Sequence, residues 1–327
     1  MSASKVLGVV VVAGVLWGCG SEWGPPVPLA ASSQGAELST PNGRNLNGRN
    51  LNGRNLNGSD LSGMLIAVDY ANARQGPTLR PLDSVRLVGS SFVGNIGTHV
   101  LSGADFVGVR FKGRLGEGGA VELRVDDADQ GTGAEHDVWS YAVSFLDKDG
   151  QWRSICRGPN DEPLRAIPAA GRWDYRQGVP GAGGAKLDDP SAFTFACEGA
   201  AIAKCIHFGY KPWALRPDGR SLAAYHQACT RMVRADFCGD GESHTQDGQW
   251  VNVYDAIGVQ QDTEPWVPEA EWDVSGSRCF TAVTRAHTEV SCPGRLNRPD
   301  CGASAHFQAG TLLMSESPLG AIPPVAP

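Results

Sequence analysis

The sequence is poor in charged residues and carries a negative balance of charge. Charged residues make up 19% of the 327-residue chain, where ~25% is usual, and the net charge is −7. The low charge excludes a long coiled coil and a highly charged disordered chain. The acidic balance argues against nucleic acid as a partner, because proteins that bind nucleic acid present basic surfaces.

The sequence also lacks the short motifs that would name a reaction or a zinc site. It has no GxSxG, HExxH or P-loop string, which carry the nucleophile, the metal ligands or the phosphate-binding loop of large enzyme classes. It has no CxxC pair, and its cysteine spacings do not match a zinc ribbon or finger. Because these strings are absent, the sequence motifs point to no particular enzyme class.

Glycine and proline are abundant, with 42 and 21 residues, as is typical of a turn-rich chain. Alternation of apolar and polar residues, as at 120–127, predicts half-buried strands, and the segments 199–210 and 221–236 predict two short helices. We therefore expect a mainly β fold with two short helices, an α+β protein. The main domain is expected at residues 115–305, followed by a frayed tail at 306–327.

The N-terminal residues resemble a bacterial lipoprotein signal. Lys5 precedes an apolar run at 6–17, which is shorter than the ~20 residues of a spanning helix and fits a signal-peptide core. The run ends in the string LWGC, which resembles the lipobox, although tryptophan replaces a small residue there. We expect residues 1–18 to be a signal peptide and Cys19 to carry the lipid. Gly20 in place of aspartate favours the outer membrane. The alternative is an ordinary signal peptide with an incidental cysteine.

Cysteine usage indicates an oxidising compartment. The chain has nine cysteines, and those after Cys19 are even in number, as expected of disulfides in an exported protein. They are Cys156, Cys197, Cys205, Cys229, Cys238, Cys279, Cys292 and Cys301. We expect up to four bridges that stabilise the main domain, with the pairing left open. The alternative use of these cysteines is metal binding.

Residues 42–63 repeat with a period of five. The string RNLNG occurs three times in succession and SDLSG follows. The pattern resembles the pentapeptide-repeat family, which implies a right-handed β-helix with the central Leu or Phe pointing inward. Arginine takes an inward position in each RNLNG unit, and burying it unpaired is costly. We therefore expect a polar repeat tract at 42–63, largely disordered at 42–58, preceded by a flexible tether at 19–41.

A second block of five-residue units lies at 85–113. It includes SSFVG and ADFVG, in which Phe92 and Phe106 stand at the central position. The block is barely longer than one four-sided coil, and stacked repeats usually need several turns to be stable. Two alternatives stay open, a short pentapeptide-type β-helix segment or edge strands of the main β domain.

Three strings in the second half of the chain carry a more specific resemblance. They are FACEGAAIAKCIHFGYKPW, HQACTRMVRADFCGDGESHTQDG and VNVYDAIGVQ. They resemble the ADYC domain, a family of exported, largely myxobacterial proteins named for a motif that reads Ala235-Asp236-Phe237-Cys238 in this chain. Phe237 stands where the family name has tyrosine, which removes a hydroxyl and keeps the ring. The resemblance covers about residues 115–300 and implies export, but it implies no reaction.

The densest polar cluster follows the second expected helix and supplies the candidate site residues. Asp236, Asp240 and Glu242 lie in a glycine-rich segment and could supply oxygen ligands to Ca²⁺. Asp236 or Glu242 could instead form an acid–base pair with His244. The structural alternative is that Asp236 binds backbone groups at the helix end, beside a bridged Cys238 and a tight glycine turn. No cofactor is identified beyond this candidate Ca²⁺ site.

Three functions are consistent with these features. The one we favour is a non-enzymatic binding module at the cell envelope, held on the membrane by its N-terminal lipid, with an envelope protein or a glycan as partner. The second is an extracytoplasmic hydrolase that uses carboxylates and histidine in the 236–247 loop. The third is a structural spacer built on pentapeptide repeats. Trp139, Trp152 and Trp173 could line a glycan groove or pack in the core.

Overall fold

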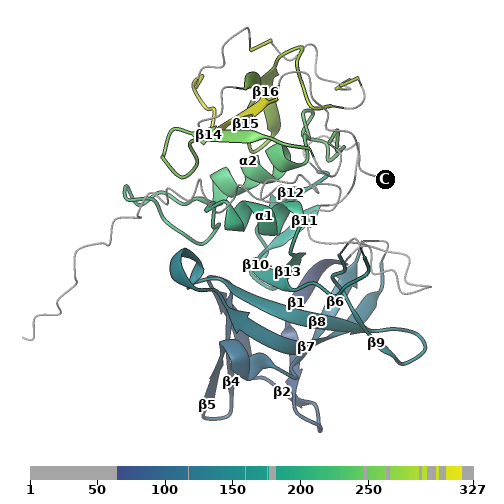
Figure 1. The fold of residues 1–327 in the computed structure, drawn as a ribbon. Coiled ribbons are helices and arrows are strands. Elements are labelled where there is room, and N and C mark those ends of the chain that lie inside the picture. The colour runs from purple at the N-terminus through teal and green to yellow at the C-terminus, as the bar shows by residue number, and fades with distance from the viewer. Residues whose placement is uncertain are drawn as a thin grey trace, which may run out of the picture.

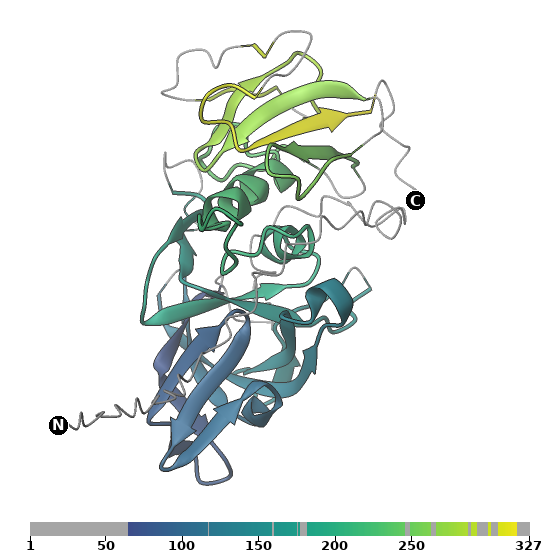
Figure 2. The ribbon, with the colours of Figure 1, turned by 90° about the vertical axis from the view of Figure 1, so that its left-hand side faces the viewer.

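The computed structural model describes residues 65–318, except for residues 117, 159, 175, 177–181, 246–248, 263–265, 287–288, 293–299 and 302–306. The described elements stack in three levels, a closed sheet, two helices and a four-stranded sheet (Figures 1 and 2). One hydrophobic core fills the closed sheet, and a second surrounds the helices and reaches the four-stranded sheet. The fold is mainly β with two helices, as predicted.

The closed sheet consists of eight antiparallel strands. Its strand order is β10-β13-β1-β6-β7-β8-β9, and β2 pairs with β1. The sheet closes on itself because β10 pairs with β8 as well as with β13. Along the predicted strand at 120–127, burial alternates, so that Val121, Leu123 and Val125 point inward. The strands are β1 (Leu65–Gln75), β2 (Arg80–Pro81), β6 (Arg110–Leu115), β7 (Ala120–Gln130), β8 (Trp139–Leu146), β9 (Trp152–Ser154), β10 (Ala166–Ala170) and β13 (Ala192–Cys197).

The closed sheet begins upstream of the boundary that we expected at residue 115. The β1 and β6 strands pair with each other, and β6 pairs in turn with β7. Strands β1, β2 and β6 therefore belong to the same sheet as the strands that follow, while residues 84–102 form a separate three-stranded sheet. The signal-peptide, tether and first repeat regions at 1–63 lie outside the described residues, and our expectations for them stay predictions.

The second repeat block, residues 85–113, forms antiparallel strands. Antiparallel pairing is what the edge-strand alternative predicts. Glycines with positive φ at Gly89 and Gly97 (63° and 61°) reverse the chain, whereas a β-helix stacks its strands in parallel. The elements are β3 (Ser84–Val88), β4 (Ser91–Ile96), β5 (His99–Ser102) and the 3₁₀ helix η1 (Gly103–Phe106), with β6 after them.

The central phenylalanines of this block do point inward, as the repeat pattern suggests, but into the closed sheet. Phe92 and Phe106 are fully buried. The Phe92 ring lies 5.1 Å from that of Phe106, 5.2 Å from Phe111 and 5.0 Å from Phe193, measured between ring centroids. Such aromatic contacts stabilise beyond the apolar area that they bury, so this meander is packed as part of the core.

The two helices occupy the segments in which we predicted them. They are α1 (Ala201–His207) and α2 (Ala223–Val233), and they lie between the two sheets (Figure 1). From Tyr225 to Val233 every residue of α2 is buried, because the helix packs against α1 on one side and the four-stranded sheet on another. A hairpin of β11 (Arg172–Asp174) and β12 (Ala185–Leu187) accompanies them. Within the described ranges, neither helix is both long and apolar enough to cross a membrane.

The frayed tail that we expected at 306–327 is wrong for residues 313–317. They form β17 (Leu313–Ser317), an interior strand of the four-stranded sheet, whose order is β14-β17-β15-β16. Leu313, Ser315 and Ser317 are buried, and the strand pairs on both sides. The other strands are β14 (Asn252–Asp255), β15 (Val267–Asp273) and β16 (Gly276–Phe280).

A polar contact joins the closed sheet to the helices. The loop that contains the 3₁₀ helix η2 (Gly133–Glu135) follows β7, and Glu135 Oε1 lies 2.6 Å from His207 Nδ1 at the end of α1. Burial lowers the pKa of His207, but the hydrogen bond and charge of Glu135 outweigh it and raise the pKa above its ordinary value. Lys211 pairs with Asp137 of the same loop. The two levels are thus fixed by charge as well as by packing.

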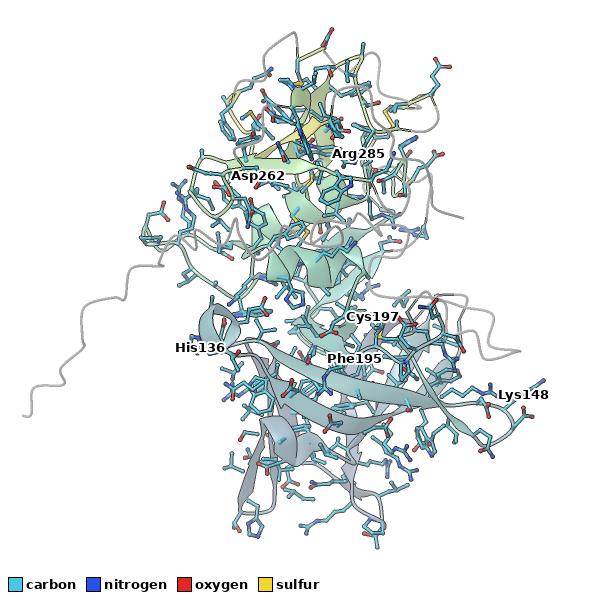
Figure 3. All side chains as sticks on the ribbon, in the orientation of Figure 1. His136, Lys148, Phe195, Cys197, Asp262 and Arg285 are labelled. Carbon is cyan, nitrogen blue, oxygen red and sulfur yellow. A yellow bond between two sulfur atoms is a disulfide. The ribbon has the colours of Figure 1, made fainter. Side chains whose placement is uncertain are left out.

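The eight cysteines after residue 155 form four disulfides, as predicted. The pairs are Cys156–Cys197, Cys205–Cys229, Cys238–Cys292 and Cys279–Cys301, with Cα–Cα distances of 5.1–5.8 Å. Figure 3 places Cys197 where the closed sheet meets the helices. Disulfides persist in oxidising compartments, so the four bridges are consistent with a location outside the cytoplasm.

His226 of α2 makes the core sensitive to acid. Its Nε2 lies 3.1 Å from the Ile202 carbonyl oxygen, which requires this nitrogen to donate, and its Nδ1 is buried with no hydrogen-bond partner among the described residues. Burial lowers the pKa of His226 to about 4 from 6.5, despite the Ile202 contact, and the Lys186 charge acts in the same direction. The folded protein therefore holds this ring neutral.

Because the folded pKa lies below the unfolded one, His226 contributes its full stability above pH 6.5 and loses it as the pH falls toward 4. We expect the free energy of unfolding to drop by about 3 kcal/mol across this interval through this group alone. Urea unfolding at pH 7 and pH 4.5 measures the drop, and the variant His226→Gln should show less of it. An equal drop in both proteins would contradict the assignment.

Candidate functional site

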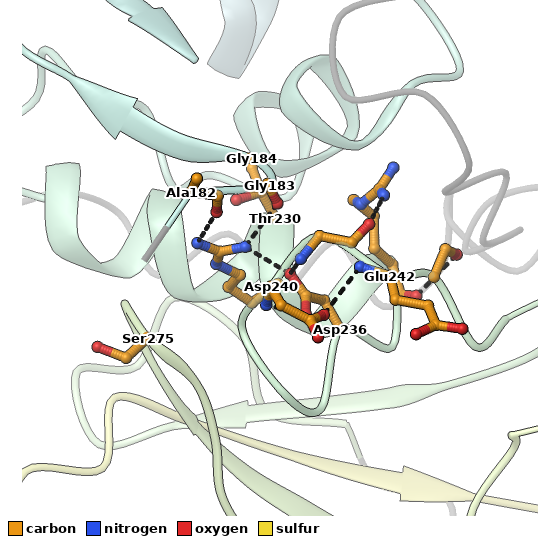
Figure 4. Close-up of polar contacts among 12 residues, drawn as sticks. Ala182, Gly183, Gly184, Thr230, Asp236, Asp240, Glu242 and Ser275 are labelled. Atoms are coloured by element: carbon orange, nitrogen blue, oxygen red, sulfur yellow. Dashed lines mark hydrogen bonds and ion pairs between the residues drawn. The ribbon is translucent and has the colours of Figure 1, made fainter. Parts of the chain in front are cut away.

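The candidate residue Asp236 is buried directly after α2, where it accepts several hydrogen bonds. The helix ends at Val233, and Ala235, with a φ of 51°, turns the chain. The Asp236 carboxylate forms an ion pair with Arg231 and accepts the backbone N–H groups of Asp240 and Gly241, each at 3.1 Å. Figure 4 shows these contacts. The carboxylate therefore closes the turn that follows the helix.

The Arg231 guanidinium extends this network to a neighbouring segment. It donates to the carbonyl oxygens of Gly183 at 2.8 Å and Ala182 at 3.3 Å. Gly183 lies so close that a Cβ on it would stand 1.8 Å from the Asp240 carbonyl oxygen. Burial raises the pKa of Asp236, although the charges of Arg231 and Arg234 oppose the rise. The pair thus holds two distant segments in contact.

The other candidate residues point in different directions. Asp240 is buried, and its Oδ1 accepts the Glu242 N–H at 3.1 Å. The Glu242 side chain is exposed, whereas His244 is buried with its ring 5.9 Å from the Phe237 ring. The structure therefore brings Asp236 and Asp240 together but separates both from an exposed Glu242. Across the described residues, no three His, Cys, Asp or Glu side chains are grouped to hold a metal ion.

Phe237 and Cys238, the last two residues of the motif at 235–238, also have structural roles. Phe237 is fully buried, and its ring centroid lies 5.1 Å from that of Trp272 and 5.3 Å from that of Phe280. Cys238 forms the disulfide with Cys292. The motif therefore supplies a turn, a buried ion pair, an aromatic anchor and a covalent link, one from each residue.

A second buried ion pair lies in the four-stranded sheet and escaped our sequence reasoning. Glu269 of β15 is fully buried and pairs with Arg285, whose position in the upper level is labelled in Figure 3. Glu269 also accepts the Arg285 N–H at 2.9 Å and the Ser315 hydroxyl at 2.8 Å. The Arg285 guanidinium donates to the Met232 carbonyl of α2. This pair fixes the helix to the sheet.

An open cavity of about 530 Å³ lies on the closed sheet, in a region that the motif search did not indicate. Among the residues that the structure describes, its lining includes three arginines, Arg80, Arg110 and Arg124, and no carboxylate. Glu122 and Asp126, outside this lining, pair with two of the arginines, so the positive charge of the surface is neutralised only in part. The lining residues are Gln75, Gly76, Pro77, Thr78, Arg80, Ile96, Val107, Gly108, Arg110 and Arg124.

The three tryptophans that we considered for a glycan groove do not share one surface. Trp173 is fully buried and lies in the core around the helices, while the half-buried Trp139 stacks near Tyr141 with ring centroids 6.3 Å apart. Trp152 does not line the cavity, but its ring contacts two arginines that do, because the guanidinium carbon of Arg124 lies 4.2 Å and that of Arg110 5.3 Å from the ring centroid. Only this tryptophan is tied to the arginine cavity.

Comparison with known proteins supports one assignment. No curated protein and no solved structure matches the chain. The ADYC domain matches residues 103–286, a range that includes most of the closed sheet, both helices and the buried turn at Asp236. This match covers more than half of the chain and contains the motif at residues 235–238, so the chain belongs to the ADYC domain family.

Proposed function

We propose that this protein is an exported lipoprotein that binds a partner at the cell envelope without transforming it. In this proposal residues 1–18 direct export, Cys19 carries the lipid, and residues 19–63 space the folded part from the membrane. Several acyl chains would hold such a domain on a bilayer, because each buried methylene contributes ~0.8 kcal/mol. The four disulfides support the exported location.

The arginine cavity is the observation that carries binding. It combines an open shape with three guanidiniums, and no acidic residue lines it in the described part of the chain. A concave surface with a few convergent polar groups is typical of ligand sites. By contrast, Asp236 is engaged by Arg231 and two backbone N–H groups. A carboxylate that is 0% exposed and held in this way cannot reach a substrate, so binding is favoured over hydrolysis.

Replacing Cys19 by alanine tests the anchoring. We expect the wild-type protein to sediment in the outer-membrane fraction of a density gradient and the Cys19→Ala variant to be lost from that fraction. The reason is that the thioether to the lipid cannot form without the sulfur. A variant that stays on the outer membrane to the same extent would contradict lipid anchoring.

Cosedimentation of the purified protein, prepared without its N-terminal lipid, with envelope polysaccharide tests the binding itself. We expect saturable binding that leaves the polysaccharide chain length unchanged on prolonged incubation. Shortening of the chains at a rate proportional to protein concentration would support the hydrolase in place of the binding module. Absence of any saturable binding to polysaccharide or to envelope protein would overturn the proposed function.

A further inference from the structure

We infer that the arginine cavity is a binding site for an oxyanion, a phosphate or carboxylate group, carried by an envelope saccharide. The inference deepens the proposed binding function and rests on it. The cavity lies between β2, the end of β4 and the strands β6 and β7, and its charge comes from Arg80, Arg110 and Arg124. Guanidinium groups match the planar and tetrahedral oxygens of these anions in geometry and charge.

The strand register concentrates positive charge beside the cavity. Arg74 of β1 stands opposite Arg110 of β6, and Arg110 stands opposite Arg124 of β7. Residues that face each other across antiparallel strands lie on the same face of the sheet, and like charges in such positions repel. A row of three arginines is therefore unfavourable by itself, and an anion placed over it would remove part of the repulsion.

Carboxylates near the row neutralise it only in part. Glu122 lies 2.8 Å from Arg110, and Asp126 lies 2.6 Å from Arg124. Within the described part of the chain, Arg74 and Arg80 have no ion pair, and the nearby Asp83 carboxylate accepts the Gly97 N–H at 2.6 Å. Exposed guanidiniums without a carboxylate partner are the groups that an external anion can pair with.

The rest of the cavity suits a saccharide that carries such an anion. Ile96 and Val107 supply apolar surface beside the guanidiniums, and the carbon face of a sugar ring packs against apolar side chains. Trp152 lies against the guanidiniums of Arg110 and Arg124 and so restricts their movement. A pre-ordered guanidinium loses less conformational freedom on binding. Gly76 and Gly108 would place a Cβ in open space, so the cavity entrance is unobstructed there.

The test compares Arg80→Gln with Arg86→Gln by isothermal titration calorimetry on the full mature chain. Arg80 lines the cavity, whereas Arg86 of β3 is an exposed arginine that does not line it. The probes are glucose 6-phosphate, polygalacturonate and neutral dextran. We expect one or both acidic probes to bind, dextran to fail, and Arg80→Gln to weaken binding about tenfold, since it removes a charge-assisted hydrogen bond. Arg86→Gln should stay within twofold of the wild type.

Each outcome decides the inference. Binding of glucose 6-phosphate alone assigns a phosphate, and binding of polygalacturonate alone assigns a uronate carboxylate. If neither acidic probe binds, or if Arg80→Gln and Arg86→Gln bind equally, the oxyanion site is overturned. The proposed function survives that result if the wild type and Arg80→Gln both cosediment with envelope polysaccharide. It fails as well if neither protein does.

Discussion

Substitution of Asp236 by asparagine is expected to reduce the free energy of unfolding by about 3–5 kcal/mol, because the buried Arg231 would keep its charge and lose its partner. Both side chains are almost completely inaccessible, at 3% and 0% exposed. The two backbone N–H groups of Asp240 and Gly241 would also lose a charged acceptor. The melting temperature should fall by roughly 10 °C, given ~2–4 °C per kcal/mol in a protein of this size.

Glu242→Gln is the matched control for this prediction. It removes a carboxylate from the same turn, but from an exposed side chain, and surface changes of this kind usually alter stability by less than ~0.5 kcal/mol. Thermal unfolding followed by circular dichroism compares the two variants. Equal melting temperatures for Asp236→Asn and Glu242→Gln would contradict a structural role for the buried pair.

Removal of the disulfide between α1 and α2 has the second large expected effect. In the double variant Cys205→Ala/Cys229→Ala the free energy of unfolding should be lower by about 3 kcal/mol. The reason is that the bridge closes a loop of sequence separation 24 and so constrains the unfolded chain. Both sulfurs are fully buried in the core around the helices, so lost packing adds to the effect. Urea unfolding under non-reducing conditions measures the difference.

Reduction of the wild type provides the control for the disulfide prediction. If the loss comes from the covalent link, excess reductant should bring the wild-type midpoint to or below that of the double variant. It should lower the double variant further, because three bridges remain there. A wild type that reductant leaves unchanged at its unfolding midpoint would show that the bridges do not form in the protein.

Much of the fold could be predicted because local patterns agree with the tertiary contacts. The apolar positions at 120–127 alternate and become the inward face of β7. The helical segments at 199–210 and 221–236 contain α1 and α2. The even cysteine count indicated up to four bridges, and the structure has four. In each case residues close in sequence carry the signal, and a single periodicity or count reveals it.

Strand β17 was missed because its buried face is polar. Two of its three buried residues are serines, Ser315 and Ser317, so the hydrophobic alternation of a strand is absent from the sequence. The Ser315 hydroxyl is satisfied by Glu269 at 2.8 Å and accepts the Trp272 indole N–H at 2.8 Å. Such partners, more than forty residues upstream, cannot be inferred from local pattern.

Of the candidate sites, one could be predicted from local sequence and the other could not. The structural alternative for Asp236 could be stated from its position after a helix and before a glycine turn, and the structure gives it these backbone partners. The arginine row beside the cavity could not be found, because Arg74, Arg110 and Arg124 are separated in sequence and meet through strand register. Charge clusters of this kind become visible only once the pairing of strands is known.

Native-state hydrogen exchange at the backbone N–H groups of Asp240 and Gly241 tests the central claim most directly. The claim is that the acidic turn of the family motif is a closed structural element and that binding takes place elsewhere. Because both amides donate to the buried Asp236 carboxylate, we predict protection close to that of the core residues of α2. Exchange at the rate of an unprotected loop would show a carboxylate open to water and to ligands, and would contradict the account.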